Sequence, residues 1–142
     1  MVVMTAKLHK KRLILILAAL LFVIGLLCAI PAKETETVGN NPARVEYLQS
    51  LGLKVAPEPV ETQEVQIPET PDPVFERYNA LQKSQGFDLS AYAGKTVSRF
   101  VYPMEGEPTV FVTLLTYRDQ VIGGDVTDRE AGGVIRSLRQ NP

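Results

Sequence analysis

Residues 109–117 read TVFVTLLTY, and this stretch decides the fold of the C-terminal part of the chain. Alternation with a period of two is typical of a β-strand, because successive side chains point to opposite faces. Here both faces are apolar, and their members are Val110, Val112 and Leu114 on one side and Phe111, Leu115 and Tyr117 on the other. The stretch therefore predicts a strand covered on both faces, or covered on one and presenting an apolar contact face on the other.

Two neighbouring stretches, residues 96–102 (TVSRFVY) and 121–127 (VIGGDVT), show the same period. The connections are short: PMEGEP at 103–108 has turn chemistry, and Arg118-Asp119-Gln120 forms a tight turn. Short connections between strands predict a three-stranded antiparallel meander over 96–102, 109–117 and 121–127. Residues 130–138 are expected to form a short helix, weakened by Gly132-Gly133.

Two helices are predicted before the meander. Asn41-Pro42 and Asp72-Pro73 both place a capping side chain before a proline, which is typical of a helix start. Helices are therefore expected over 42–51 and 73–84, and a glycine follows each. Residues 53–68 alternate weakly between prolines, so short extended pieces are expected there at a sheet edge. The predicted fold is α+β, with the helix at 73–84 packed on one face of the sheet.

The N-terminal part differs sharply in composition. Leu13 to Ile30 are 18 residues without a charge, and as a helix they would be about 27 Å long, close to the ~30 Å hydrocarbon core of a bilayer. We therefore expect a transmembrane helix over 13–30 in contact with the lipid bilayer. Signal cleavage is the alternative to a retained signal-anchor, but cutting after Ala29 or Ala32 would leave Leu27 or Ile30 at −3, where a small residue is usual.

The charged residues beside this segment then predict its orientation in the membrane. Residues 1–12 carry basic residues only, so the positive-inside rule places them in the cytoplasm. The expected organisation is a cytoplasmic basic tail (1–12), the transmembrane helix (13–30), a linker (31–41) and an extracytoplasmic α+β domain (42–142). The expected location is the cell membrane, spanned once, with the domain outside.

Composition also excludes several function classes. The net charge is −1 for the whole chain and −5 for residues 33–142, which excludes a strongly basic nucleic-acid binder. The single cysteine, Cys28, excludes a disulfide framework, and the single histidine, His9, lies in the N-terminal part. No catalytic, cofactor-binding or metal-ligating residue is predicted. An enzyme that uses Asp88 or Asp125 is the alternative, and it requires carboxylates that converge in a cleft.

Gly123-Gly124-Asp125 interrupts the last predicted strand. Without a full phosphate-loop motif, two glycines inside a strand indicate a bulge or the close approach of another element. That element is either the helix at 73–84, through Tyr78, or a partner.

The run Tyr78-Asn79-Ala80-Leu81-Gln82-Lys83-Ser84-Gln85-Gly86-Phe87-Asp88-Leu89, with Tyr92, Gly94-Lys95 and the IGGDV run at 122–126, resembles the bacterial family called domain of unknown function 4830. The resemblance covers about residues 43–138 and implies an N-terminal membrane segment, but no activity. Candidate interaction or close-packing residues are Gly123, Gly124, Asp125, Tyr78, Asn79 and Gln82.

The sequence favours a non-catalytic module that binds another protein or an envelope component. The alternatives are an extracytoplasmic hydrolase-like enzyme that uses carboxylates, and a structural protein that self-associates in the envelope. The apolar strand at 109–117 is the expected contact surface if one of its faces is open. No nucleic acid and no cofactor are expected as partners.

Overall fold

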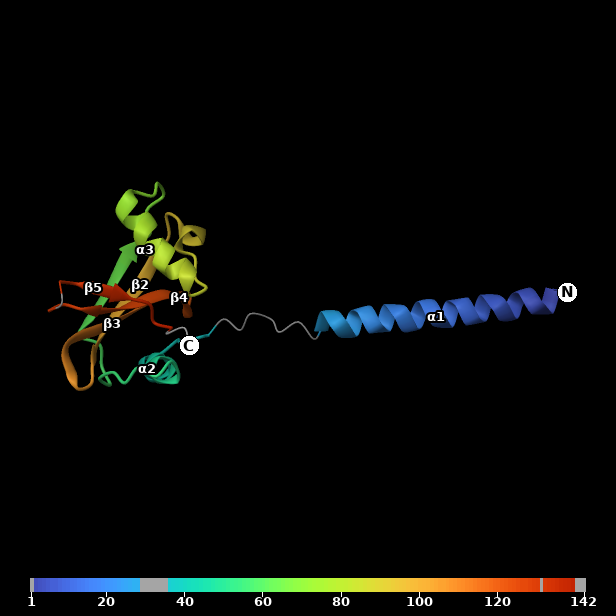
Figure 1. The fold of residues 1–142 in the computed structure, drawn as a ribbon, viewed down its shortest axis with the longest axis horizontal. Coiled ribbons are helices and arrows are strands. Elements are labelled where there is room, and N and C mark those ends of the chain that lie inside the picture. Colours follow the sequence, from blue (N-terminus) through green and yellow to red (C-terminus); the bar gives the residue numbers. More distant parts are fainter. Residues whose placement is uncertain (1, 29–35, 131, 140–142) are drawn as a thin grey trace. The chain divides into compact units, whose positions relative to one another are not determined.

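The computed structural model describes residues 2–28, 36–130 and 132–139 (Figure 1). The chain divides into two compact units, Met1–Glu34 and Thr35–Pro142. Their boundary lies inside the predicted linker, residues 31–41. Residues 36–41 belong with the second unit, because Val38 is only 2% exposed and its N–H donates to the Asp119 carbonyl at 2.6 Å.

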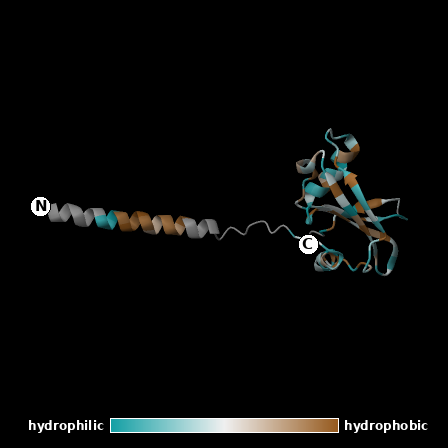
Figure 2. Ribbon diagram, turned by 180° about the vertical axis from the view of Figure 1, so that it is seen from behind, coloured by the Kyte–Doolittle hydropathy of each residue, from teal (hydrophilic) through white to brown (hydrophobic). Residues whose placement is uncertain are grey.

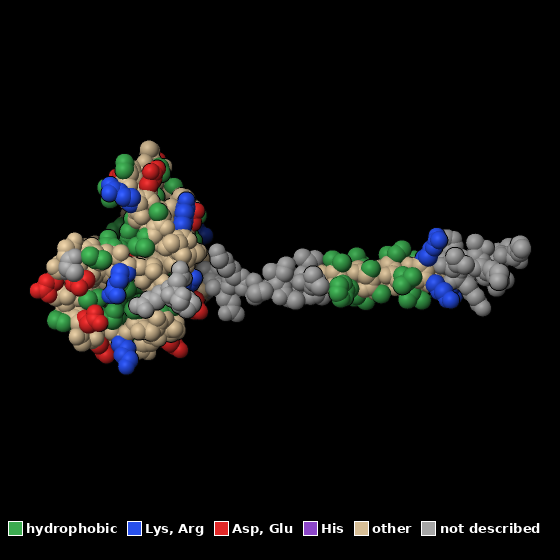
Figure 3. Space-filling model, viewed as in Figure 1, with side chains coloured by type: hydrophobic (Ala, Val, Ile, Leu, Met, Phe, Trp, Pro, Cys, Tyr) green, Lys and Arg blue, Asp and Glu red, His purple; other side chains and the backbone are tan. Residues whose placement is uncertain are grey.

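The first unit contains helix α1 (Val2–Cys28). Its described side chains begin with three basic residues at 10–12 and continue with uncharged residues at 13–23, whose large apolar side chains are more than half exposed (Figure 2 and Figure 3). At 1.5 Å per residue this uncharged stretch is about 16 Å long, about half of a bilayer core.

No helix among the described residues is long and apolar enough to cross a membrane. The prediction of a transmembrane helix over 13–30 is therefore wrong, and the single-pass location at the cell membrane that followed from it is unsupported. Residues 29 and 30, and the side chains of 24–28, lie outside the described part of the chain.

The second unit is built on a five-stranded antiparallel sheet. Its strands, in spatial order, are β1 (Glu61–Gln66), β2 (Thr96–Met104), β3 (Glu107–Tyr117), β4 (Gln120–Asp128) and β5 (Val134–Arg136). The three predicted strands are the central ones, β2 to β4. The α+β class is confirmed, but the predicted count of three strands is wrong: β1 lies within 53–68, where extended pieces at a sheet edge were expected but not counted as a strand, and β5 lies where a helix was predicted.

Each missed edge strand has a physical reason. In β1 only Val65 is strongly apolar, because an edge strand exposes most of its side chains, and the period of two is therefore weak. The predicted helix over 130–138 is also wrong. Gly132 and Gly133 both have a φ of +73°, which a right-handed helix cannot accommodate, and the chain instead turns back to pair Val134–Arg136 with β4.

The helices begin and end by local signals. In α2 (Asn41–Ser50) the capping side chain is that of Asn40, one residue before the predicted cap, and it accepts from the Ala43 N–H. In α3 (Pro73–Ser84) Asp72 caps the helix as predicted, accepting from the Phe75 N–H at 2.7 Å. A short 3₁₀ helix, η1 (Leu89–Tyr92), follows α3.

The two helices cover opposite faces of the sheet, because alternate residues of β3 contact different clusters. The face covered by α2, called the α2 face, holds a large apolar cluster: Val38, Tyr47, Leu48, Leu53, Val55, Tyr102, Val110, Val112, Leu114, Val121, Val126 and Leu138. The face covered by α3 and η1, called the α3 face, holds a smaller one: Ile67, Leu89, Val97, Leu115 and Ile122. Strand β3 is therefore covered on both sides.

Candidate functional site

The glycine pair in β4 admits a neighbour on each side of the sheet. A Cβ atom on Gly123 would lie 2.9 Å from the Gln82 Oε1 atom, and one on Gly124 would overlap Leu138 and the Thr113 carbonyl. The element against Gly123 is thus α3, as one of the two predicted alternatives had it. The contact comes from Gln82, whereas the sequence suggested Tyr78.

The side-chain amide of Gln82 forms the two hydrogen bonds with the Gly124 backbone that a neighbouring strand would form. Its Nε2 donates to the Gly124 carbonyl at 2.9 Å, and its Oε1 accepts from the Gly124 N–H at 2.9 Å. Strand β5 reaches only as far as Val126, so among the described residues this stretch of β4 has no neighbouring strand on its β5 side. The buried Gln82 amide therefore satisfies backbone groups that would otherwise be buried without a partner.

Gln85 extends this arrangement to the C-terminal segment. Its Nε2 donates to the Gly124 carbonyl at 2.9 Å and to the Gln82 Oε1 at 3.0 Å. Its own Oε1 accepts from the Leu138 N–H at 2.8 Å. The last turn of α3 and its C-cap residue, Gln85, thus hold both the middle of β4 and the segment after β5.

Asn79 holds the loop that follows α3. Its Oδ1 accepts from the Leu89 N–H at 2.8 Å, and its Nδ2 donates to Asp88 at 3.0 Å. Asp88 also accepts from the Ser90 hydroxyl and N–H, and these hydrogen bonds, the hydroxyl first, lower its pKa to about 2. Asp88 is therefore an ionised cap of η1 and holds no proton to donate at neutral pH.

Tyr78 and Asp125 form the other polar contact between α3 and β4. The Tyr78 hydroxyl donates to Asp125 Oδ2 at 2.6 Å, and the Thr127 hydroxyl donates to Oδ1 at 2.7 Å. Burial raises the pKa of Asp125 above its usual value, against the effect of these hydrogen bonds, and burial together with Asp125 raises the pKa of Tyr78. Both oxygens of this carboxyl group accept a hydrogen bond within the domain.

Five of the six candidate residues therefore meet where α3 contacts β4, and the sixth, Asn79, holds the loop after α3. The two carboxylates of the enzyme alternative are attached to different partners, Asp88 to Asn79 and Ser90, and Asp125 to Tyr78 and Thr127. Neither lines the pocket described next. Within the described ranges, no group of His, Cys, Asp or Glu residues could hold a metal ion.

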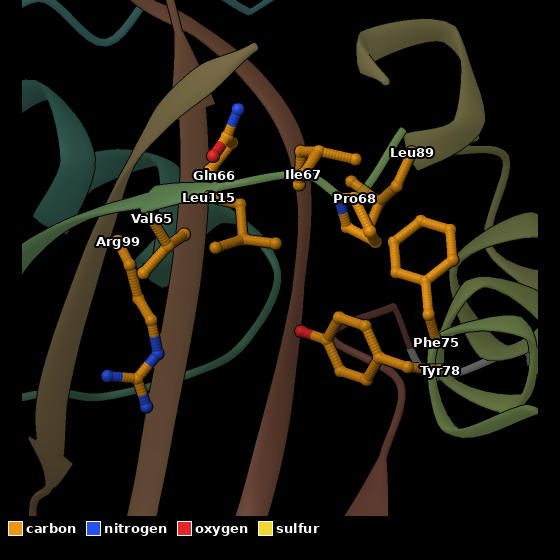
Figure 4. A pocket seen from close by; sticks show the side chains of 9 residues that line it. All are labelled: Val65, Gln66, Ile67, Pro68, Phe75, Tyr78, Leu89, Arg99 and Leu115. Carbon is orange, nitrogen blue, oxygen red and sulfur yellow. The ribbon is translucent and has the colours of Figure 1, made fainter. Parts of the chain in front are cut away.

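A pocket of about 210 Å³ lies on the α3 face, between α3 and the strands β1 to β3. Figure 4 shows Val65, Leu115 and Arg99 on the same side of the sheet, with Phe75 and Tyr78 reaching toward them from α3. The lining residues are Val65, Gln66, Ile67, Pro68, Phe75, Tyr78, Leu89, Arg99 and Leu115. Its walls are mainly apolar, and only the Arg99 guanidinium is charged.

Arg99 is held at the pocket by an ion-pair network. Its Nη1 lies 3.1 Å from Glu61 Oε2, and Arg129 lies 3.4 Å from the other oxygen of Glu61. The hydrogen bond from Arg99 is the main reason why the pKa of Glu61 lies below its usual value. One carboxylate is shared by two guanidinium groups, and this network holds Arg99 in place beside the pocket.

Sequence reasoning missed Arg99, Glu61, Phe75 and Gln85 as site residues. One available signal was the position of Arg99, which lies between Val97 and Val101 on the same face of β2. A charged residue at an inward position of a strand indicates a polar site on that face. Gln85 lies within the run that carries the family resemblance, but its partners are distant in sequence.

Comparison with known proteins identifies the family. The family model described as Domain of unknown function (DUF4830) matches residues 47–126, which is more than half of the chain. No curated protein and no solved structure gives a significant match. The matched range extends from α2 to β4 and contains the six candidate residues and every residue that lines the pocket. The chain therefore belongs to the DUF4830 family of domains of unknown function.

Proposed function

We propose that the domain is a non-catalytic binding module, and that its pocket beneath α3 receives one apolar side chain of a partner protein. The observation that carries this proposal is the pocket itself, with apolar walls and a single guanidinium group at its rim. Apolar pockets with a few placed polar groups are typical of binding sites.

The size of the pocket supports a single side chain as the occupant. At about 210 Å³ it is smaller than the ~300–1,000 Å³ of pockets that hold drug-sized ligands. A cavity of about 150 Å³ is already large enough for a benzene ring. A leucine or phenylalanine side chain therefore matches the space, whereas a larger metabolite does not.

The chemistry around the pocket supports binding rather than catalysis. Asp125 is 5% exposed and both of its oxygens accept hydrogen bonds from within the domain. Asp88 is a helix cap. A general acid or base must reach a substrate proton, and both groups are engaged elsewhere.

The position of the contact surface differs from the sequence expectation. Both faces of strand 109–117 are covered, and Phe111 at its margin lies under the Arg129 guanidinium at 3.8 Å from the ring centre. This strand therefore offers no open apolar face, and the pocket takes its place as the proposed contact.

The test is photo-crosslinking of the full chain in cells, with a benzophenone amino acid at Gln66, an exposed residue at the rim of the pocket. The Val65→Phe substitution would fill the pocket. Val60→Phe is the matched control, because Val60 is 57% exposed and lies outside the pocket. We expect a defined protein adduct that Val65→Phe removes and Val60→Phe retains. An adduct that survives both substitutions equally would contradict the proposal.

A further inference from the structure

The outer edge of β1 is the last strand edge on its side of the sheet. The Ile67 N–H donates to the Lys95 carbonyl at 2.9 Å, and the register pairs Val65 with Val97. In an antiparallel pair, alternate residues direct both backbone groups toward the neighbouring strand. The backbone N–H and C=O groups of residues 61, 63 and 65 therefore point toward β2. Those of Thr62, Glu64 and Gln66 point away from it, toward the open edge.

The pocket opens beside this same edge. Four of its nine lining residues are consecutive, from Val65 at the end of β1 to Pro68 just after it. A strand added beside β1 would lie about 4.8 Å away, and every second side chain would point to the α3 face. One such side chain would stand next to Val65, within reach of the pocket.

The segment of chain that forms and flanks this edge is acidic, although Glu61 is paired with Arg99 and Arg129. Residues 55–76 contain six acidic residues and no lysine or arginine. The exposed ones are Glu58, Glu64, Glu69, Asp72 and Glu76. Like charges that face each other across strands are destabilising, so a second copy of β1 would be repelled. A basic segment would be attracted.

We propose that the partner of this domain is an extended basic segment that adds to the sheet as a sixth strand beside β1. This inference rests on the proposed function of the pocket, and it names the chemistry of the segment that supplies the apolar side chain. Backbone hydrogen bonds to Thr62, Glu64 and Gln66 give affinity, and the pocket selects the side chain.

The test uses a fluorescent seven-residue peptide in which lysine and leucine alternate, with fluorescence anisotropy as the readout and the full chain as the receptor. A peptide with glutamate in place of lysine is the comparison. We expect saturable binding of the lysine peptide that weakens as salt is added, and at least tenfold weaker binding of the glutamate peptide. Equal binding of the two peptides would overturn the inference that the partner segment is basic.

Substitutions at Glu64 test strand addition itself. Proline at this position removes an outward N–H group, and edge strands tolerate proline when the missing N–H faces solvent. Glu64→Gln removes the same charge and keeps the N–H. We expect Glu64→Pro to weaken peptide binding about tenfold beyond Glu64→Gln, because one backbone hydrogen bond is lost and the added strand is displaced. Equal affinities of these two variants would overturn the inference.

A second pair of variants controls for the possibility that Glu64→Pro does not fold. Thr62→Pro and Thr62→Ala repeat the comparison at another outward position, and thermal unfolding reports whether each variant is folded. The two proposals can fail separately. If Val65→Phe removes the cellular adduct but neither proline variant weakens peptide binding, the pocket binds its partner without strand addition. If Val65→Phe and Val60→Phe behave alike, the proposed function of the pocket fails first.

Discussion

Helices α2 and α3 cover opposite faces of one sheet, but their buried side chains differ in chemistry. The buried residues of α2 are Tyr47 and Leu48, which join the large apolar cluster on the α2 face. The buried residues of α3 are Asn79 and Gln82, two amides that bond to loop and strand backbone. Apolar burial is non-directional, whereas hydrogen bonds fix the position of a helix.

This difference accounts for the open space directly beneath α3, whereas a second pocket, of about 490 Å³, lies at the margin of the α2 face beside Leu53, Met104 and Val126. An apolar helix face would pack closely against the sheet, because protein interiors have few voids. Helix α3 is instead held through amide contacts at Gly124 and Leu89, and the space between Phe75 and Val65 is left open. Helix α2 is thus held by apolar burial, whereas α3 adds amide hydrogen bonds to a smaller apolar cluster and leaves a pocket beneath it.

The largest expected effect is on the α2 face. Leu48 is fully buried, so Leu48→Ala should lower the free energy of unfolding by about 2–5 kcal/mol through lost burial and a cavity. Urea unfolding of the full chain measures this value. Val74→Ala, at a residue of α3 that is 70% exposed, is the control and should change it by less than about 0.5 kcal/mol. A similar loss in both variants would remove the contrast between the faces.

A smaller effect is expected where the contacts from both faces meet in β4. In Gly124→Ala the new methyl group would overlap Leu138 and the Thr113 carbonyl, and backbone cannot easily move away. We expect a loss of about 1–3 kcal/mol in unfolding free energy, the range for overpacking. Gly39→Ala is the control, because its methyl group would make only ordinary contacts with Asp119 at 3.5 Å. An equally stable Gly124→Ala variant would show that Leu138 can leave its place freely.

The amide contact on the α3 face is tested by Gln82→Leu. This substitution keeps the side-chain size but leaves the Gly124 N–H and C=O groups without the amide. Each buried polar group left unsatisfied costs about 1–3 kcal/mol, so urea unfolding should show a loss at the lower end of that range if Gln85 keeps its bond to Gly124. Gln49→Leu on the exposed surface of α2 is the matched control. A neutral Gln82→Leu variant would mean that α3 is held by apolar contact after all.

The last prediction concerns the pH dependence of stability. The folded-state pKa of Asp125 lies above 3.8, so the folded protein binds this proton more tightly than the unfolded chain. Its contribution to stability is full below pH 3.8 and is lost as the pH rises through the folded pKa. Asp125→Asn should therefore remove a decline in unfolding free energy toward neutral pH.

In the same experiment, Asp88 is expected to change the unfolding free energy with pH in the opposite direction. Its folded pKa of about 2 lies below 3.8, so its contribution is present above pH 3.8 and is lost as the pH falls toward 2. Asp88→Asn should flatten the acid side of the curve and leave the neutral side unchanged. Urea unfolding curves between pH 2 and pH 8 measure the unfolding free energy of both variants as a function of pH. The same pH dependence in the two variants would contradict the opposite directions of the two pKa shifts.

The parts of the fold that follow from local signals were predictable. Asp72-Pro73 and Gly86 set the bounds of α3, and the two-sided alternation of 109–117 gave the central strand. The edge strands were predictable only in part: extended structure at a sheet edge was expected around β1, but its single strongly apolar residue did not define a strand, and β5 is only three residues long. For the N-terminal helix, hydrophobicity alone led to a wrong prediction.

The candidate site was predictable only in part. Six residues, five of which meet where α3 contacts β4, could be named from the glycine pair and the family resemblance. The hydrogen bonds between these residues could not be predicted, because Gln82 and Gly124 are 42 residues apart. The sequence around a glutamine does not indicate which distant group it will bond. The pocket depends on the register of three strands and on the position of α3, which no single segment encodes.

The amide contacts of α3 also have a consequence for synthesis of the chain. Gln82 leaves the ribosome 42 residues before Gly124, and Gln85 leaves it 53 residues before Leu138. At about 5–20 residues per second, Gln82 waits roughly 2–8 s for its partner. During this time water can satisfy both amides, whereas an apolar helix face would be free to aggregate. The two amides of this region therefore add no apolar surface to the nascent chain before the sheet is complete.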